Sequence, residues 1–340
     1  MRGAAISTRR RMRTPDSLTA EPLEREGRPQ ARSLSVSVII PSYNHAAFIG
    51  EAIASALAQT RPPDEILLVD DGSSDDTAGV VQPFAGRVRC FLRHHEGMGA
   101  TYNFGVREAR GDVIAFLESD DVWTPTYLEE TLGFLEEHPE VAWISTARRF
   151  IDERGERTGE ELRKRTREIH FTFESCLERD LGFSSTPVVR RAFLLAVGPF
   201  HNGTFLPDNE MMLRFALHFP MAHLPRPIYL HRRHRTNTSS DPLRNTLETI
   251  GILERFRTEH PELIAGQARL LRRCLAKYQG MAGAFSLVNG GGSLPQARRL
   301  LWQAVRNDPL RPKHWRRWLG GYLLGPDGYR ALRRLWRRNG

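Results

Sequence analysis

The stretch Val36–Asn44 reads VSVIIPSYN, and the stretch Leu67–Thr77 reads LLVDDGSSDDT. Each begins as an apolar run and changes abruptly to polar, turn-forming residues, which is the pattern of a buried strand that ends in a loop. Pro41 has no backbone N–H to donate, so we expect it to close the first strand. Ligands of open α/β sheets bind beyond the carboxyl ends of such strands, so these two ends predict a binding site.

A third segment has the same character. Asp112–Glu118 reads DVIAFLE and leads into an acidic cluster that contains Asp120 and Asp121. Carboxylate oxygens are the ligands that Mg²⁺ prefers, so this cluster suits a hard divalent cation. The carboxylates of Asp70 and Asp71, which end the second strand, stand where the base or ribose of a nucleotide can be held.

These segments resemble family 2 glycosyltransferases with the GT-A fold. The matches are VSVIIPSYN at 36–44, LLVDDGSSDDT at 67–77 and AFLESDDVW at 115–123, with weaker ones at 97–105 and 207–215. They follow the family's order over roughly residues 35–240. The resemblance implies an inverting, metal-dependent transfer of a sugar from a nucleoside-diphosphate-sugar to an acceptor hydroxyl. Polysaccharide, glycolipid or cell-envelope glycan synthesis is the expected setting, with Mg²⁺ or Mn²⁺ as cofactor.

The resemblance also implies residues for the donor nucleotide. Pro41, Tyr43 and Asn44 stand where the family seats the base, Asp70 matches the acid that pairs with the base edge, and Asp71 adjoins it. Without the resemblance, the segment from Asp70 is equally well a strand-to-helix turn.

The next loop departs from the family's pattern. Thr101-Tyr102-Asn103 stands where the family commonly has Ala-Arg-Asn, so one donor to phosphate is missing. His94 and His95 are either compensating ligands or solvated loop residues.

The metal site is implied at Glu118-Ser119-Asp120, which occupies the position of the family's D-x-D motif. Alternation along an extended strand end points Glu118 and Asp120 to the same side. Asp120 is the expected metal ligand with Glu118 as its partner, and Asp121 supports them from outside. Glu118 and Ser119 are also expected to contact the donor. The alternative is an exposed acidic turn.

Asp208 falls at the position of the family's catalytic base. Single displacement needs a carboxylate to take the proton of the acceptor hydroxyl. Glu210 is the rival base, and an Asp after Pro207 is also typical of a helix N-cap. Farther along, Arg232-Arg233-His234 resembles the family's closing Y-R-x-H element. The resemblance implies that His234 contacts the metal or the diphosphate, and that Arg232 or Arg233 neutralises charge on the departing nucleoside diphosphate.

Strand–helix alternation from 36 to 146 predicts a mostly parallel sheet flanked by helices. We expect a disordered basic leader at 1–34, a GT-A domain at 35–240 and a helical C-terminal region with a basic tail at 241–340. The runner-up function is a non-catalytic nucleotide-sugar-binding relative that acts as a partner or scaffold subunit. Glu118, Tyr102 and Pro207 support it, because all three are off the family's pattern.

The cysteine content and the apolar runs of the sequence indicate the cellular compartment. The 340 residues include 3 cysteines, an odd number that argues against a disulfide framework and for a reducing compartment. We expect all three to be small buried hydrophobes. No apolar run approaches the ~18 residues of a membrane span, and no apolar core follows the N-terminal arginines. A cytoplasmic protein is therefore expected.

The positive charge gathers at the C-terminal end. Residues 296–340 hold twelve Arg or Lys against only Asp308 and Asp327, so their net charge is +10, whereas the whole chain has +9. This tail predicts a peripheral contact with the cytoplasmic face of an anionic membrane. The alternative is a set of helices that pack on the catalytic domain with arginines in solvent. No nucleic-acid-binding module is recognisable, so nucleic acid is not an expected partner.

Overall fold

The computed structural model describes residues 33–162, 172–179, 187–237, 240–262, 264–289 and 292–338. The predicted leader, apart from its last two residues, lies outside the described residues. From Leu34 onward the chain forms one compact unit.

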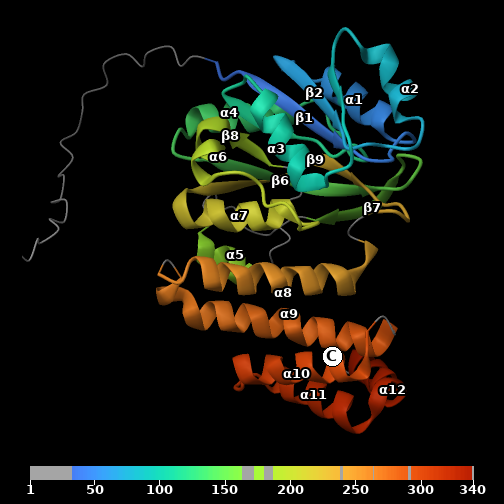
Figure 1. The fold of residues 1–340 in the computed structure, drawn as a ribbon, viewed down its shortest axis with the longest axis vertical. Helices are drawn as coiled ribbons and strands as arrows, with labels where there is room; N and C mark the ends of the chain where they lie inside the picture. Colours follow the sequence, from blue (N-terminus) through green and yellow to red (C-terminus); the bar gives the residue numbers. More distant parts are fainter. Residues whose placement is uncertain are drawn as a thin grey trace, which may run out of the picture. The chain divides into compact units, whose positions relative to one another are not determined.

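The described residues form a sheet of nine strands, which lies in the upper half of Figure 1. Its order is β3 (Arg89–Leu92), β2 (Glu65–Asp70), β1 (Val36–Ser42), β4 (Val113–Phe116), β8 (Val188–Arg190), β6 (Trp143–Ile151), β9 (Met221–Arg232) and β5 (Val122–Trp123), and β7 (Arg157–Leu162) pairs with β6. The first four strands are parallel, whereas β8 is antiparallel to both of its neighbours. The sheet is therefore mixed, and the predicted parallel pairing holds for the half that β1 to β4 build.

The predicted strand–helix alternation is confirmed, with small shifts at the ends. The helices of the first part are α1 (Ile49–Leu57), α2 (Thr77–Val81), α3 (Met98–Glu108), α4 (Tyr127–Glu137), α5 (Phe173–Arg179), α6 (Arg191–Val197) and α7 (Pro207–His218). The later ones are α8 (Pro242–Glu259), α9 (Ala268–Asn289), α10 (Leu294–Asn307), α11 (Pro312–Leu323) and α12 (Gly325–Arg338).

Pro41 lies inside β1 and does not close it. Its register partner is Val69, and Ser42 still pairs with Asp70. On the other side of β1, the pairing with β4 ends at Ile39. Pro41 therefore follows the point at which β1 becomes an edge on that side, where a missing N–H costs least.

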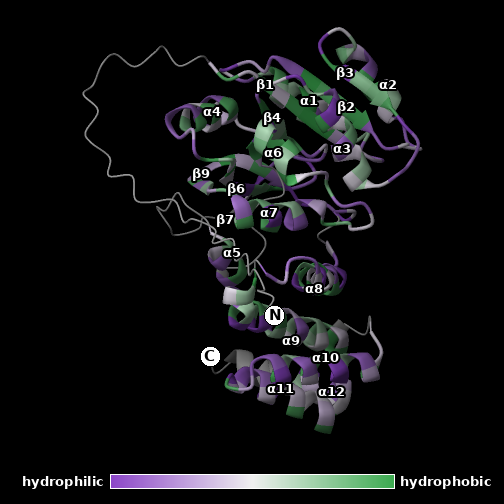
Figure 2. Cartoon of the chain, turned by 60° about the vertical axis from the view of Figure 1, so that its left-hand side comes forward, coloured by the Kyte–Doolittle hydropathy of each residue, from purple (hydrophilic) through white to green (hydrophobic). Residues whose placement is uncertain are grey.

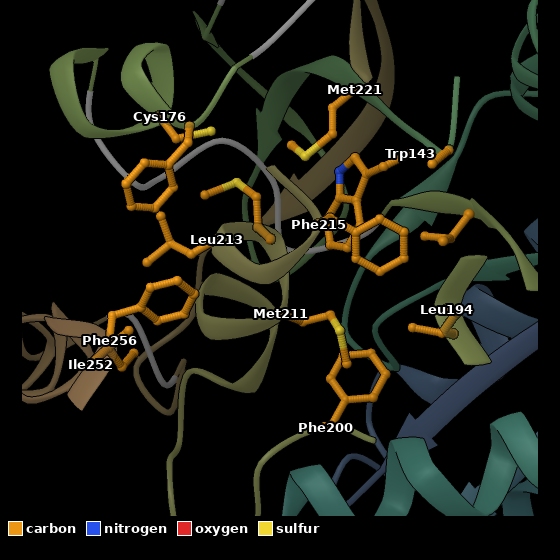
Figure 3. Close-up of a cluster of buried hydrophobic side chains, with 14 of the residues drawn as sticks. Trp143, Cys176, Leu194, Phe200, Met211, Leu213, Phe215, Met221, Ile252 and Phe256 are labelled. Atoms are coloured by element: carbon orange, nitrogen blue, oxygen red, sulfur yellow. The ribbon is translucent and has the colours of Figure 1, made fainter. Parts of the chain in front are cut away.

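Two hydrophobic layers cover the sheet. One packs α1 and α4 on it, with Ile53 and Leu132 fully buried. The other contains α3 and α7, and Figure 3 shows Met211, Leu213 and Phe215 of α7 among its members. The central strands are correspondingly coloured hydrophobic in Figure 2.

The second layer continues past the predicted boundary at residue 240. Ile252 and Phe256 of α8 lie beside α7 in the same cluster, together with Leu275 of α9 (Figure 3 shows the first two). The helical C-terminal region thus begins as part of the core of the sheet domain.

Helix α10 packs along α9, and their contact is close. A Cβ at Gly283 would lie 2.7 Å from the Leu301 Cγ atom. Leu301 is fully buried. Within the part of the chain that the structure describes, no helix has the length and hydropathy to cross a membrane.

The expectation for the cysteines is confirmed in two cases and wrong in the third. Cys176 and Cys274 are buried, but Cys90 is exposed. Cys90 lies on β3, an edge strand of the sheet, whose residues are only partly buried or exposed.

Candidate functional site

The ends of β1 and β2 are joined by Asn44. Its backbone has a φ of 55°, a left-handed conformation that Asn tolerates better than most residues. The Asn44 Oδ1 atom accepts a hydrogen bond from the Ser74 backbone N at 2.7 Å, and the Asn44 N–H donates to Ser73 Oγ at 2.8 Å. Asn44 therefore shapes the loop that follows each strand.

Asp70 and Asp71 stabilise these loops through hydrogen bonds. Asp70 accepts hydrogen bonds from the Ser73 backbone N and hydroxyl, at 2.9 and 2.5 Å. Asp71 accepts from the backbone N of Glu96 and of Gly97, at 2.8 and 2.9 Å. Both residues are nearly buried, and the hydrogen bonds of Asp71 join the loop after β2 to the loop after β3.

An aromatic pair lies on these loops. The rings of Tyr43 and His95 stack with centroids 4.4 Å apart and planes inclined by 24°. The Asp71 Oδ2 atom lies 2.9 Å from His95 Nδ1 and fixes the orientation of the imidazole. Tyr43 is 45% exposed, which leaves a flat ring available to a ligand. The His95 side chain is nevertheless 57% exposed, so its two roles considered in the sequence, compensating ligand and solvated loop residue, stay predictions.

The acidic cluster after β4 lies beside two imidazoles. His45, Asp120 and His234 each offer one ligand atom, and these atoms all lie within 4.8 Å of one another. The His234 Nε2 atom lies 2.9 Å from Asp120 Oδ2, which also accepts from Asn237 Nδ2 at 3.1 Å. Burial disfavours the charge on Asp120, but the hydrogen bond from His234 and the nearby imidazoles hold its pKa below the usual range. One carboxylate and two imidazoles are a donor set that fits a divalent metal ion.

Glu118 lies outside this group of three. Its carboxylate accepts a hydrogen bond from the hydroxyl of the buried Tyr102. Burial raises the pKa of Glu118 well above its usual range, and the charges of Asp120, Asp121 and Asp208 raise it further, against the hydrogen bond from Tyr102. Because β4 ends at Phe116, before both residues, strand alternation does not determine how Glu118 and Asp120 point, and the pairing of the two as metal ligands stays a prediction.

Ser119 and Asp121 support the cluster through buried contacts. The Ser119 Oγ atom lies 2.7 Å from His45 Nδ1. Asp121 accepts from the backbone N of Arg232 at 2.7 Å and from the hydroxyl of Tyr229. Asp121 therefore lies in a supporting position, as expected, and anchors the loop after β4 to β9.

Arg232 has a different place from the one that the sequence suggested. Its side chain is fully buried, and its Nε donates to the Asp120 carbonyl at 2.9 Å. The Nη1 atom donates to the carbonyls of Asp152 and Glu153, and Nη2 lies 2.6 Å from Glu51 Oε2. The guanidinium therefore holds the backbone of Asp120 in place. It points into the protein interior and not toward a departing diphosphate.

Asp208 lies in the first turn of α7, directly after Pro207 at the first helical position. Burial raises its pKa to about 6, against the effect of hydrogen bonds from backbone N–H groups and of the charge of Arg148. The charge of Asp208 raises the pKa of Glu118, so the start of α7 lies near the acidic cluster. A carboxylate with a pKa near neutrality is suited to accept a proton. The N-cap position belongs to Leu206, so the capping role considered for Asp208 is not the one observed.

The rival base, Glu210, is committed elsewhere. It is nearly buried, and its two carboxylate oxygens lie 2.8 and 2.9 Å from Nε and Nη2 of Arg214. Arg214 in turn donates to the carbonyl of Pro199. This pair joins α7 to the preceding loop.

Sequence reasoning missed His45 and Glu51. His45 directly follows the VSVIIPSYN segment, and its position after a strand end was a usable signal. Glu51 had none, because its partner Arg232 is 181 residues away.

This chain is similar to known glycosyltransferases in sequence and in fold. The glycosyl transferase family 2 model matches residues 37–193. An uncharacterized glycosyltransferase of Nostoc sp. is 39% identical over 100 residues, which are 28% of this chain and 31% of that protein. Chondroitin synthase of Escherichia coli is 37% identical over 123 residues, 35% of this chain and 18% of that protein. The chain thus matches less than a third of the length of these two relatives.

Solved structures share the fold over most of the chain. TarS residues 1–349 of S. aureus in complex with UDP superposes with a TM-score of 0.64 at 20% identity, covering 90% of this chain and 92% of that one. The mannosyltransferase PcManGT of Pyrobaculum calidifontis, in complex with GDP-Man and Mn²⁺, superposes with a TM-score of 0.53 at 19% identity, covering 89% and 88%. Residues 37–193, from β1 to α6, thus match the family 2 glycosyltransferase model, and the chain has the GT-A fold of these solved structures.

Proposed function

We propose that the chain transfers a sugar from a nucleoside-diphosphate-sugar to an acceptor hydroxyl with inversion at the anomeric carbon. The observation that carries the proposal is the group of His45, Asp120 and His234 beyond the strand ends. Asp208, in the first turn of α7, supports it, because burial raises the pKa of this carboxylate to about 6. At neutral pH this carboxylate is ionised and takes the proton of the attacking hydroxyl.

The donor nucleotide is proposed to lie across the ends of β1 and β2. The exposed ring of Tyr43, held by its stack on His95, supports the base. The Asp70 carboxylate accepts hydrogen bonds from Ser73. Its remaining lone pairs can accept further hydrogen bonds from the base edge or the ribose.

The proposed metal ligands are Asp120 and His234, with His45 completing the set. A bound divalent cation neutralises charge on the diphosphate leaving group. Two imidazoles make this set softer than an all-oxygen one, which favours Mn²⁺ over Mg²⁺. Glu118, hydrogen-bonded to Tyr102, is proposed to contact the donor rather than the metal.

The non-catalytic alternative loses part of its support. Pro207 occupies the first position of α7, where its missing N–H costs nothing. Tyr102 packs on Phe116 and Phe200 and donates to Glu118. Both departures from the family's pattern therefore have structural roles that are compatible with catalysis.

A screen of UDP-, GDP- and dTDP-sugars tests the proposal. Thermal shift and mass spectrometry follow donor binding and donor hydrolysis with Mn²⁺, with Mg²⁺ and with EDTA. We expect one donor class to be bound in a metal-dependent manner and to be turned over when an acceptor is added. Metal-dependent binding without turnover by any donor and acceptor pool would favour the scaffold alternative.

We further propose a glycan or lipid-linked acceptor and a peripheral contact with the cytoplasmic face of a membrane. One face of α11 supports the contact: Trp315, Leu319, Tyr322 and Leu323 follow helical spacing and are all exposed, Leu323 by 70%. Arginines border this face, as is typical of helices that lie in a membrane interface. The packing of α10 on α9 is compatible with this contact, because it leaves the outer face of α11 uncovered.

Co-sedimentation with phosphatidylglycerol and phosphatidylcholine vesicles tests this contact. The double variant Trp315→Ser and Leu319→Ser is expected to lose binding to phosphatidylglycerol vesicles. The matched control is Leu92→Ser and Leu195→Ser, which alters two exposed leucines of the sheet region. Equal pelleting of both doubles would contradict the membrane role of α11.

A further inference from the structure

A cavity of about 570 Å³ lies among α9, α11 and α12, separate from the strand ends that form the transfer site. Six of its lining residues are basic or can become so: Lys277, Arg311, Lys313, His314, Arg316 and Arg317. The lining, as far as the structure describes it, includes no carboxylate. Such a concentration of one charge sign creates a strong positive potential inside a concave wall.

The imidazole of His314 is the most informative group in this cavity. It is only 2% exposed, and neither ring nitrogen has a hydrogen-bond partner. The closest acid, Asp308, has its Oδ2 atom 4.0 Å from His314 Nε2, which is too far for a hydrogen bond. A buried polar group without a partner is costly, so a ligand that supplies one gains that free energy.

Gly280 on α9 leaves room beside this imidazole. A Cβ at position 280 would lie 3.1 Å from His314 Nδ1 and 3.1 Å from Arg317 Nη1. The two nitrogens therefore approach the same bare backbone. A larger residue at 280 would crowd both groups.

The cations of the cavity act on one another. The charge of Arg317 lowers the pKa of Lys313, and burial and the charges of Arg311 and Lys277 lower it further. Burial lowers the pKa of His314, with the charges of Arg317, Arg311 and Lys313 in addition and only Asp308 in opposition. An anion bound among these groups relieves their repulsion. The positive end of the α11 dipole, which begins at Pro312, favours the same charge.

We propose that this cavity binds an organic phosphate, with the phosphate group among Arg311, Lys313 and His314 and an apolar portion against Phe285 and Met281. Guanidinium groups match the geometry of phosphate oxygens, and the imidazole supplies a further donor. The volume exceeds the need of one phosphate and falls within the range of small-ligand pockets. The proposal is independent of the transfer reaction. Its source is either a soluble phosphate ester or the headgroup of a phospholipid.

The experiment uses the full chain and sodium pyrophosphate as probe, in isothermal titration calorimetry at constant ionic strength. EDTA is present, so that no divalent cation links the probe to Asp120. The test variant is the double Arg311→Gln and Lys313→Gln, and both residues are exposed enough to change without loss of the fold. The matched control is Arg299→Gln and Arg306→Gln, which removes two exposed charges from α10 outside the cavity.

We expect saturable binding by the unchanged chain and by the control, and binding at least tenfold weaker in the test variant. A third variant, Gly280→Val, is expected to weaken binding while all charges remain. Absence of saturable binding, or equal weakening in both doubles, would overturn the proposal.

Vesicles separate the two sources. If pyrophosphate displaces the chain from phosphatidylglycerol vesicles and the test variant no longer pellets with them, the phosphate is that of a lipid headgroup. If vesicle binding is the same in test and control variants while pyrophosphate binding differs, the ligand is a soluble ester. Both results retain the phosphate site.

Discussion

The Nε2 atom of His234 lies 2.9 Å from the Oδ2 atom of Asp120, although 114 residues separate them in the chain. The contact joins the loop after β4 to the end of β9. It brings an imidazole and a carboxylate into one group with His45, and this group is the proposed seat of the metal ion.

Asp120→Ala and His234→Ala should each reduce the dependence of nucleotide binding on Mn²⁺, because each removes a proposed metal ligand. Calorimetric titration of the chain with UDP and with GDP, with Mn²⁺ and with EDTA, measures this. His138→Ala, at the end of α4, is the control. Metal-dependent binding that is unchanged in Asp120→Ala would contradict the metal site.

Asp208→Asn should lower kcat by about 10²–10⁴-fold while donor affinity is retained, because the change removes the proton acceptor and preserves the volume. Glu210→Gln should instead lower Tm through loss of the Arg214 pair and leave kcat within about tenfold, since loss of a charge-assisted hydrogen bond acts on stability. A smaller loss of kcat in Asp208→Asn than in Glu210→Gln would indicate that Glu210 is the catalytic base.

The pH dependence of turnover should follow Asp208. Its pKa of about 6 means that the basic form dominates at neutral pH, so kcat should fall on acidification through pH 6. Below that pH the expected loss is about tenfold per pH unit. Initial rates in buffers of constant ionic strength measure it. A flat profile across this range would exclude Asp208 as the base.

The raised pKa of Asp208 should also lower the stability of the folded chain as the pH rises. Folding raises the pKa of Asp208 from 3.8 to about 6, so the folded state binds more protons between these values and loses stability as pH rises through them. Asp208→Asn removes that loss. Its Tm should match that of the unchanged chain below pH 4 and exceed it above pH 6, as measured by calorimetry.

Tyr43→Ala should weaken nucleotide binding, since base–aromatic stacking is worth about 1–3 kcal/mol, which corresponds to roughly 5–150-fold in Kd. Tyr43→Phe keeps the ring and should bind normally. Equal Kd values for Tyr43→Ala and the unchanged chain would remove Tyr43 from the base site.

Arg232→Lys should destabilise the fold, because it leaves the carbonyls of Asp152 and Glu153 without their donor, at about 1–3 kcal/mol for each buried acceptor. The matched control, Arg226→Lys, alters a 66% exposed side chain and should change stability by at most about 0.5 kcal/mol. Urea denaturation measures both. Equal midpoints would show that Arg232 has no positioning role.

The sequence by itself determined the first half of the fold. The apolar runs at 36–42 and 65–70 end in turn residues, and local pattern suffices to place such strands and the helices between them. It also marked Tyr43, Asp70, Asp120 and Asp208, because they lie at strand ends or at a helix start, where the resemblance to family 2 glycosyltransferases implies site residues.

Only the tertiary structure decided which of these groups act together. His45, Asp120 and His234 come from three distant segments, and Arg232 turned inward because Glu51 and the carbonyls of the loop after β6 surround it. Cys90 is exposed because β3 became an edge strand. The cation-lined cavity likewise exists only after α11 has packed beside α9. Local periodicity records which face of an element is apolar, but the partner of each face depends on packing between residues far apart in the chain.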